Sequence, residues 1–255
     1  MTTVAVLGAD GRTGGAVVEA ITDRHDADLA AAVDAEPRPD AQPPIEASDD
    51  LATLLADRGV DVLVDFSIPE AIAKAAPVCA EAGVAIVTGT TGLEAHHRAT
   101  LDAASESVPV LKAANFARGI QVLLQTVETA VRGLPGYDIE LTETHHNGKR
   151  DAPSGTAETI LETIDSERAH ETVYGREGIQ PREEDEVGVH VRRAGTIRGE
   201  HEVMLADNDE VVSLAHRAED RGVFAAGALD AAAWIDGRDP GWYDFADVVD
   251  VEGDR

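Results

Sequence analysis

The fifteen residues 143–157 carry the densest set of reactive side chains in the sequence. His145 and His146 are adjacent, and Lys149 follows them after two residues. Histidine exchanges protons near neutral pH, and lysine supplies a compact positive charge with rotatable donors. This combination is suited to proton transfer on a substrate that carries a negative charge.

The same stretch contains the signals of a helix N-terminus. Pro153 and Ser154 are typical of a helix start, with Ser154 as a candidate N-cap. The N–H groups of Gly155 and Thr156 would then point out of the helix end, where they favour a carboxylate or phosphate. A metal site is an alternative, but adjacent histidines without a supporting cysteine are poor ligands, and we predict no metal. A solvated polar loop is the other alternative, but Lys149 is one of only three lysines in the chain.

A glycine-rich loop near the N-terminus indicates a second site. The apolar residues 3–7 lead into GADGRTGG and then into a helical pattern, which is the context of a dinucleotide-binding loop. Asp34 ends the next apolar run, where an acid accepts hydrogen bonds from the adenosine ribose. The alternative is a simple strand-to-helix turn. The expected cofactor-binding residues here are Gly8, Ala9, Asp10, Gly11, Arg12, Thr13 and Asp34.

The elements that must position these sites alternate in the first half of the chain. Apolar spacing predicts strands at residues 3–7, 29–33, 60–64, 84–87 and 108–111, and helices at residues 13–24, 49–58, 69–82 and 94–107. Residues 36–47 are expected to form a proline-rich loop. The alternation is typical of an α/β Rossmann-type doubly wound parallel sheet. Ligands bind at the carboxyl edge of such a sheet, which adds Gly89, Thr90, Thr91, Ala113, Ala114, Asn115 and Phe116 to the expected cofactor-binding residues.

The second half has a different rhythm and predicts a second α+β domain with a mixed or antiparallel sheet. A helix at residues 120–133, a strand at 138–144 and a helix at 154–169 precede three strand-like runs, which we interpret as an antiparallel meander. The alanine-rich helix at residues 223–235 is expected to return to the first domain. The predicted boundaries are 1–116 for the dinucleotide-binding domain, 117–217 for the substrate-binding and oligomerisation domain, and 218–255 for the returning segment.

Composition excludes several function classes. The 49 acidic residues exceed the 21 basic ones and give a formal net charge of −28, so nucleic acid is not an expected partner. The surplus of acids and the scarcity of lysine resemble proteins of salt-accumulating halophiles. No apolar stretch approaches the roughly 20 residues of a membrane span, and we expect a cytoplasmic protein that does not bind membranes. Cys79 is the only cysteine and is expected to be an inert buried thiol.

The motifs, taken together, resemble those of the dihydrodipicolinate reductase family. Residues 143–157 satisfy every position of its signature E-x-H-H-x-x-K-x-D-A-P-S-G-T-A, and GADGRTGG, VDFSIPEA, GTTGL, AANFARG, RRAGTIRGEHEV, HRAEDRGVFAAGAL and WYDFADVV extend the resemblance over the chain. The resemblance implies an NAD(P)H-dependent oxidoreductase of diaminopimelate and lysine biosynthesis. It would reduce 4-hydroxy-tetrahydrodipicolinate to tetrahydrodipicolinate with loss of water.

The resemblance also implies roles for single residues. His145 would donate or accept a proton, and Lys149 would donate one and pair with a carboxylate. The expected contacts of the dicarboxylate substrate are His146, Lys149, Ser154, Gly155 and Thr156. The family implies a homotetramer formed through the sheets of the second domain. Where relatives often place an arginine after the ribose-binding acid, this chain has Ala35, so NADH is the expected preferred cofactor and NADPH a second one.

Two other functions fit part of the pattern. Another Rossmann oxidoreductase, acting on an amino-acid-derived carbonyl or imine, would explain the glycine loop but not the fifteen-residue signature. A non-catalytic nucleotide-sensing module predicts a degraded second site, whereas residues 143–157 match in full. Turnover of reduced nicotinamide with the reductase substrate distinguishes both alternatives from the reductase.

Overall fold

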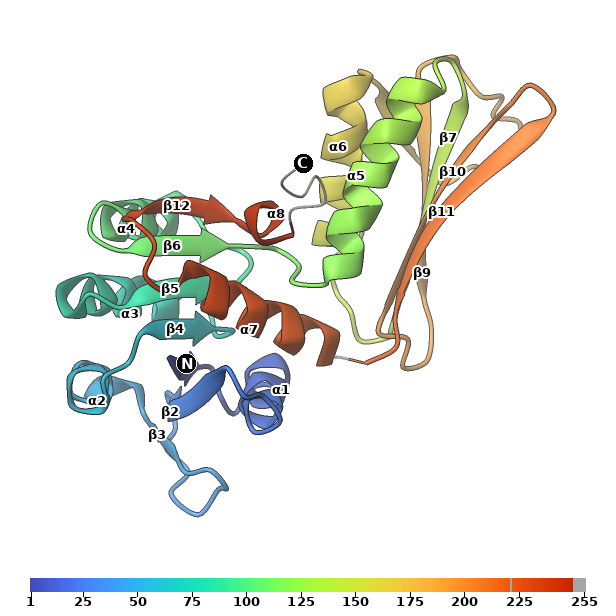
Figure 1. Cartoon of the computed structure of the whole chain (residues 1–255). Coiled ribbons are helices and arrows are strands. Elements are labelled where there is room, and N and C mark those ends of the chain that lie inside the picture. Colours follow the sequence, from blue (N-terminus) through green and yellow to red (C-terminus); the bar gives the residue numbers. More distant parts are fainter. Residues whose placement is uncertain (221, 250–255) are drawn as a thin grey trace. The chain divides into compact units, whose positions relative to one another are not determined.

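The apolar runs of the first half form one parallel sheet in the computed structural model, which describes residues 1–220 and 222–249 (Figure 1). The strand order is β12-β6-β5-β4-β1-β2-β3, and all of these neighbouring strands pair in parallel. The strands are β1 (Thr2–Leu7), β2 (Ala27–Asp34), β3 (Ile45–Ala47), β4 (Val62–Asp65), β5 (Ala85–Thr88), β6 (Pro109–Lys112) and β12 (Gly241–Asp244).

Helices cover both faces of this sheet because its strands carry apolar side chains on both. Along β1, Val4 and Val6 pack in the core shared with α1 and α7, whereas Ala5 and Leu7 pack in the core shared with α2, α3 and α4. The helical elements are α1 (Arg12–Ile21), the 3₁₀ turn η1 (Ser48–Asp50), α2 (Leu51–Arg58), α3 (Pro69–Ala82), α4 (Ala95–Ser105), α7 (Gly222–Ile235) and α8 (Phe245–Val248). The predicted doubly wound fold is confirmed.

Residues 1–117 and 222–249 belong to one unit, and residues 118–220 form a second. Residues 221 and 250–255 of the predicted returning segment lie outside the described residues. Within the first unit, α7 contacts α1 and strands β1, β4, β5 and β6. The alanine-rich sequence of α7 allows this close approach, since Gly227 and its small neighbours are buried.

The second unit is a mixed sheet with helices on one face (Figure 1). Its strand order is β11-β10-β7-β9-β8, and α5 packs against α6 and against β11. Ile139, Leu141, Val203 and Leu205 alternate along two central strands and are completely buried. The elements are α5 (Arg118–Gly133), β7 (Asp138–His145), α6 (Gly155–Glu167), β8 (Glu171–Tyr174), β9 (Glu186–Arg193), β10 (Gly199–Asp207) and β11 (Glu210–Ala218).

The predicted antiparallel meander of the last three strands is wrong. β10 and β11 do form an antiparallel hairpin, but β7 lies between β9 and β10 and pairs in parallel with β9. The turn after β9 passes the end of β7, where the N–H of Ala194 donates to the carbonyl of His145 at 2.9 Å. An alternating pattern determines which side chains face the core, but it does not determine which strand is the neighbour.

Three short strands were not predicted, namely β3, β8 and β12. Each lies at an edge of its sheet and has three or four residues, so its apolar pattern is too short to detect. β3 falls inside the predicted proline-rich loop 36–47, whose last residues therefore form a strand. Among the described residues, no helix has the length and hydropathy that crossing a membrane requires.

Candidate functional site

The loop between β1 and α1 is packed so closely that only glycine fits at two of its positions. Gly8 has a left-handed backbone with φ of +82°, and a Cβ there would lie 2.6 Å from the carbonyl oxygen of Phe66. A Cβ at Gly14 would lie 2.1 Å from the carbonyl oxygen of Gly8. The glycines therefore bring the start of α1 directly against the end of β1, where its N–H groups are available to an anionic ligand.

A cavity of about 390 Å³ opens beside this loop. It runs over the carboxyl ends of β1, β2 and β4 and includes the carboxylate of Asp34. That carboxylate accepts the N–H of Asp10 at 3.0 Å and the N–H of Ala35 at 2.7 Å, so it is held in place facing the loop. The other lining residues are Leu7, Gly8, Gly11, Ser48, Phe66, Ser67, Ile68 and Ala71. An adenosine ribose has the size and donor groups that this pocket requires.

Arg38 brings a positive charge to the same region. Its guanidinium forms an ion pair with the carboxylate of Asp10, whose own N–H donates to Asp34. The backbone of Arg38 is anchored by two hydrogen bonds with Ile45 at the start of β3. The cation nearest to Asp34 in this chain of contacts thus comes from the proline-rich loop and not from position 35.

Asp65 is a functional candidate that was not among the predicted site residues. Its buried carboxylate accepts the hydroxyls of Thr88 and Thr90 at 2.6 Å each, and the N–H and hydroxyl of Ser67. Burial raises the pKa of Asp65, while these hydrogen bonds act in the opposite direction. The carboxylate joins the loops after β4 and β5. The sequence contains one signal for this residue, an acid at the end of the apolar run VLVD at residues 62–65.

The remaining expected cofactor residues have different environments. Gly89 lies against Phe66, whose ring would be 2.2 Å from a Cβ at this position. Ala113 is buried and Ala114 is exposed, while Asn115 accepts the N–H of Ala117 at 2.8 Å. The ring of Phe116 is buried in the core, 5.6 Å from the ring of Phe66 by their centroids, so only its backbone is available to a cofactor. Ala9 is buried, Thr13 is half-buried, and Arg12 and Thr91 are exposed.

In the second unit, the signature runs from the end of β7 through a loop into α6. Ser154 is the N-cap of α6, as predicted, and its hydroxyl accepts the N–H of Ala157 at 3.2 Å. Gly155 and Thr156 form the first turn of α6. His145 ends β7 and is 9% exposed, whereas His146 is half-buried in the loop.

Lys149 lies in this loop with its ammonium group 2.7 Å from the carboxylate of Asp151. Burial alone would raise the pKa of Asp151, but the contact with Lys149 outweighs it and lowers that pKa. The side chain of Asp151 is 55% exposed. A substrate carboxylate that pairs with Lys149 would share or replace this exposed partner.

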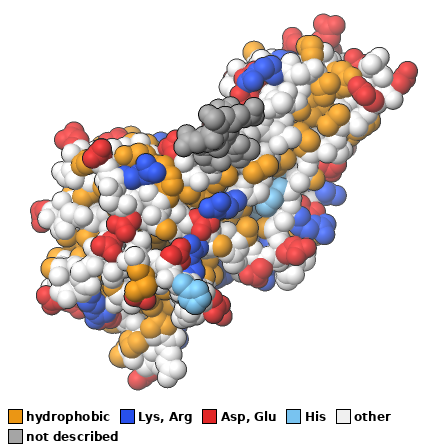
Figure 2. All heavy atoms as spheres, in the orientation of Figure 1, with side chains coloured by type: hydrophobic (Ala, Val, Ile, Leu, Met, Phe, Trp, Pro, Cys, Tyr) orange, Lys and Arg blue, Asp and Glu red, His pale blue; other side chains and the backbone are white. Residues whose placement is uncertain are grey.

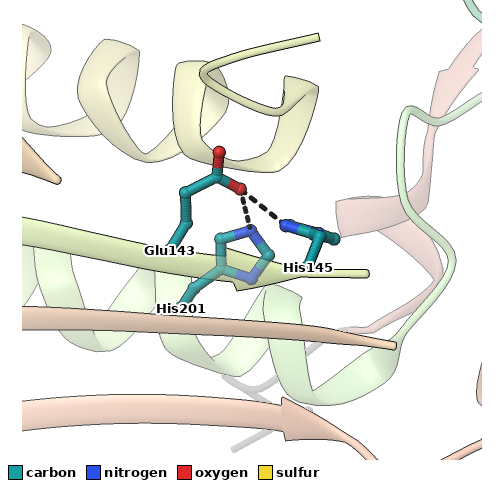
Figure 3. Close-up of side chains that lie close together, drawn as sticks. All are labelled: Glu143, His145 and His201. Atoms are coloured by element: carbon teal, nitrogen blue, oxygen red, sulfur yellow. Dashed lines mark ion pairs between the residues drawn. The ribbon is translucent and has the colours of Figure 1, made fainter. Parts of the chain in front are cut away.

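Glu143 is completely buried beside the two histidines His145 and His201 (Figure 3). One of its oxygens, Oε2, lies 2.7 Å from Nδ1 of His145 and 3.9 Å from Nε2 of His201. The other oxygen, Oε1, accepts the N–H of Ser154 at 3.0 Å and a guanidinium N–H of Arg193 at 2.9 Å. Glu143 lies within the signature but was not among the predicted site residues, and neither were Arg193 and His201.

The three donors Glu143, His145 and His201 lie within 4.8 Å of one another, which raises the question of a metal ion. The carboxylate already accepts two N–H donors through Oε1, and one of them belongs to the cationic Arg193. A guanidinium 2.9 Å from a ligand oxygen opposes a divalent cation by charge repulsion. The residues therefore do not fit a metal ion, and the absence of a bound metal stays a prediction.

His201 is held in its neutral form. Burial, with a further contribution from His145, lowers the pKa of His201 from 6.5 to about 4. Its Nε2 lies 3.1 Å from the hydroxyl oxygen of Ser154, and its Nδ1 has no hydrogen-bond partner among the described residues. Since a buried N–H without an acceptor costs free energy, the single proton resides on Nε2 and points to Ser154.

The lowered pKa of His201 predicts a loss of stability in mild acid. Between pH 6.5 and about 4 the unfolded chain binds a proton at this histidine that the folded chain does not bind. The contribution is therefore fully present above pH 6.5 and is lost as the pH falls towards 4. The midpoint of urea unfolding in high salt should fall less between pH 7 and pH 5 in His201→Gln than in the wild type. The same pH dependence in both proteins would contradict the prediction, and His25→Gln, at an exposed histidine, is the matched control.

Comparisons with known proteins agree over nearly the whole chain. The family model described as "Dihydrodipicolinate reductase, N-terminus" matches residues 2–116, and the one described as "Dihydrodipicolinate reductase, C-terminus" matches residues 119–249. A 4-hydroxy-tetrahydrodipicolinate reductase of Haloarcula marismortui is 56% identical over 251 residues, with 98% of this chain and 100% of that protein covered. The reductase of the same name from Natronomonas pharaonis is 54% identical, with 96% and 99% covered.

The fold also matches a solved structure. The dipicolinate-bound dihydrodipicolinate reductase from Paenisporosarcina sp. TG-14 has a TM-score of 0.77 at 20% sequence identity, with 96% of this chain and 97% of that chain covered. At this identity the likeness supports the fold alone.

Proposed function

The chain belongs to the dihydrodipicolinate reductase family, and we propose on this basis that residues 143–157 form its substrate site and the loops after β1, β2, β5 and β6 its cofactor site. It is an NAD(P)H-dependent oxidoreductase of diaminopimelate and lysine biosynthesis. The reaction reduces 4-hydroxy-tetrahydrodipicolinate to tetrahydrodipicolinate, with one hydride and one proton added and one water lost. The observation that carries this function is the family match over both units at 54–56% identity to reductases of this name.

The substrate is a dicarboxylate, and the proposed site is chemically suited to one. Lys149 supplies a positive charge, and the first turn of α6, with Gly155 and Thr156, supplies N–H groups of a helix N-terminus. His146 and Ser154 complete the proposed contacts. His145, whose Nδ1 faces the Glu143 carboxylate, exchanges a proton with the reacting substrate, and Lys149 supplies another.

A pyridine nucleotide is the cofactor, and it supplies the hydride when bound. The tightly packed Gly8 and Gly14 leave the start of α1 open to the pyrophosphate, and Asp34 faces the ribose pocket. The loops joined by Asp65 lie at the ends of β4 and β5. The backbone of residues 113–116 at the end of β6 completes the proposed site.

We expect NADH to be preferred over NADPH. The carboxylate of Asp34 accepts ribose hydroxyls and repels a 2′-phosphate, and the position after it is Ala35. Arg38, already paired with Asp10, is the residue that would take the 2′-phosphate of NADPH. Steady-state kinetics should therefore give a higher kcat/KM with NADH, and Arg38→Gln should reduce kcat/KM with NADPH several-fold more than with NADH. A clearly higher kcat/KM for NADPH in the wild type would contradict this assignment.

The direct test of the activity is oxidation of reduced nicotinamide, followed by absorbance in molar KCl. The substrate is generated in the cuvette from pyruvate and aspartate semialdehyde by the preceding enzyme. Turnover that depends on both precursors is the expected result. Cofactor binding without turnover would instead support the nucleotide-sensing module, and turnover only with other carbonyl or imine substrates would support another Rossmann oxidoreductase.

The assembly, location and partners stay predictions. We propose a homotetramer formed through the sheet of the second unit, which sedimentation in high salt can test. We also propose a cytoplasmic location and no binding of nucleic acid or membranes. The net charge of −28 supports the absence of nucleic-acid binding, since such a surface repels phosphate.

A further inference from the structure

The buried carboxylate of Glu143 contacts residues from three segments around the proposed substrate site, namely β7, the start of α6 and β9. Oε2 faces His145 at the end of its own strand. Oε1 accepts from Ser154, the N-cap of α6, and from Arg193 on β9. The same guanidinium nitrogen of Arg193 donates to the carbonyl of Asp151 at 2.6 Å, so the loop between β7 and α6 is held at this point as well.

The carboxylate stays ionised in this environment. Burial alone would raise the pKa of Glu143, but the contacts with His145, Arg193 and Ser154 outweigh it and hold that pKa at about 2. A buried charge with these partners is costly to disturb, since removal of one partner leaves the others without compensation. Glu143 is therefore a fixed negative charge at all pH values at which an enzyme of this kind works.

The position of this charge decides the proton arrangement of His145. The 2.7 Å between Oε2 and Nδ1 is an ion-pair distance, and its angles fall outside those of a hydrogen bond. Two unprotonated acceptors this close would still repel each other, so Nδ1 of His145 carries a proton. In the neutral ring, Nε2 then holds the lone pair that accepts a proton, and in the charged ring it holds the proton that is donated. The Nε2 edge of the ring lies close to Gly199, where a Cβ would be 3.1 Å from Nε2.

We propose that Glu143 is a positioning residue that selects the Nδ1-protonated form of His145 and aims its Nε2 at the reacting substrate. The inference rests on the proposed catalytic role of His145. The arrangement parallels the general pattern in which a buried carboxylate orients a catalytic histidine without exchanging a proton itself. His201 fills the space beside the pair and donates to Ser154, so it supports the same geometry as a neutral partner.

The decisive variant is Glu143→Gln. Its amide oxygen can still accept from Ser154 and Arg193, but its NH₂ group would face Nδ1 of His145 and favour the opposite tautomer. We expect kcat to fall roughly 10–10³-fold with a small change in KM for the substrate. A residue that only anchors the loop would leave kcat close to the wild type, because the loop contacts are retained.

The pH profile of kcat/KM provides the readout that a structural role would not move. The carboxylate that faces the ring at 2.7 Å is lost in Glu143→Gln, so the pH profile of kcat/KM should differ from that of the wild type. The other charged or titratable groups of this cluster are Arg193, His201, His216 and Lys149, and all of them are retained in the variant. The matched control is Glu140→Gln, which removes another carboxylate from the same strand. This carboxylate pairs with Arg182 and His190 and not with His145.

A double-mutant cycle separates this inference from the proposed site. Glu143→Gln should cause no further loss of kcat in a His145→Gln background, because its effect acts through His145. Wild-type kcat in His145→Gln would overturn the catalytic role of His145 itself. A strong loss in His145→Gln together with an unchanged kcat and pH profile in Glu143→Gln would overturn only the positioning role.

If Glu143→Gln does not fold, the proposal can be tested on the wild-type protein through the tautomer of His145. ¹⁵N NMR of histidine-labelled enzyme, with His145 assigned by its absence in His145→Gln, reports which ring nitrogen is protonated at high pH. A protonated Nδ1 and an unprotonated Nε2 are expected. The opposite tautomer would overturn the proposal.

Discussion

Lys149→Ala is expected to raise the KM for the dicarboxylate substrate and to lower kcat. The ammonium group is the compact charge of the proposed substrate site, and its present partner is the exposed carboxylate of Asp151. A charge-assisted hydrogen bond contributes about 1.5–3 kcal/mol, so KM should rise roughly 10–100-fold. The proposed proton donation by Lys149 is lost as well, so kcat should fall in addition. Lys74→Ala, at an exposed lysine of α3, is the matched control for loss of a positive charge.

His145→Gln should act mainly on kcat. The imidazole exchanges a proton but contributes little to binding of an anion, so kcat should fall roughly 10²–10⁴-fold with a modest change in KM. Affinity for NADH, measured by fluorescence titration, should be unchanged in both variants because the expected cofactor contacts lie in residues 8–116. Near-wild-type kcat/KM in both variants would refute the assignment, and loss of NADH binding would indicate that this loop has a structural role.

The second large effect concerns salt. The formal net charge of −28 makes the folded chain repel itself, and acidic side chains are scattered over the face seen in Figure 2, not gathered in one patch. The screening length falls from about 10 Å at 0.1 M salt to about 3 Å at 1 M. We therefore expect the melting temperature to rise by roughly 10 °C or more between 0.05 and 2 M KCl, which corresponds to a few kcal/mol for a protein of this size.

Calorimetry or circular dichroism over a KCl series measures this effect. NaCl should give nearly the same curve, because screening depends on ionic strength and not on which monovalent cation is present. A melting temperature that stays constant over the series would refute the halophilic interpretation.

Local patterns in the sequence were sufficient to predict the fold class and one helix cap of this protein. Alternating apolar runs and helical periods predicted the doubly wound sheet, and the glycine loop with Asp34 predicted the side of the sheet that carries the cavity. Ser154 was identified as an N-cap from its place before a helical run, and the structure confirms it. These features depend on residues within a few positions of one another, where backbone geometry and capping act directly.

Only the tertiary structure decided which distant segments are neighbours. β7 lies between β9 and β10, and this order brings Arg193 and His201 to Glu143 from positions 50 and 58 residues later in the chain. Likewise, Asp65 meets Thr88 and Thr90 only because β4 and β5 pair side by side. Strand order minimises the free energy of the whole core, to which every strand and covering helix contributes, so no local pattern contains it. Side-chain types and spacing thus predicted which residues are suited to proton transfer or ligand binding. The packing of the sheets determined the partners, burial and proton positions of these residues.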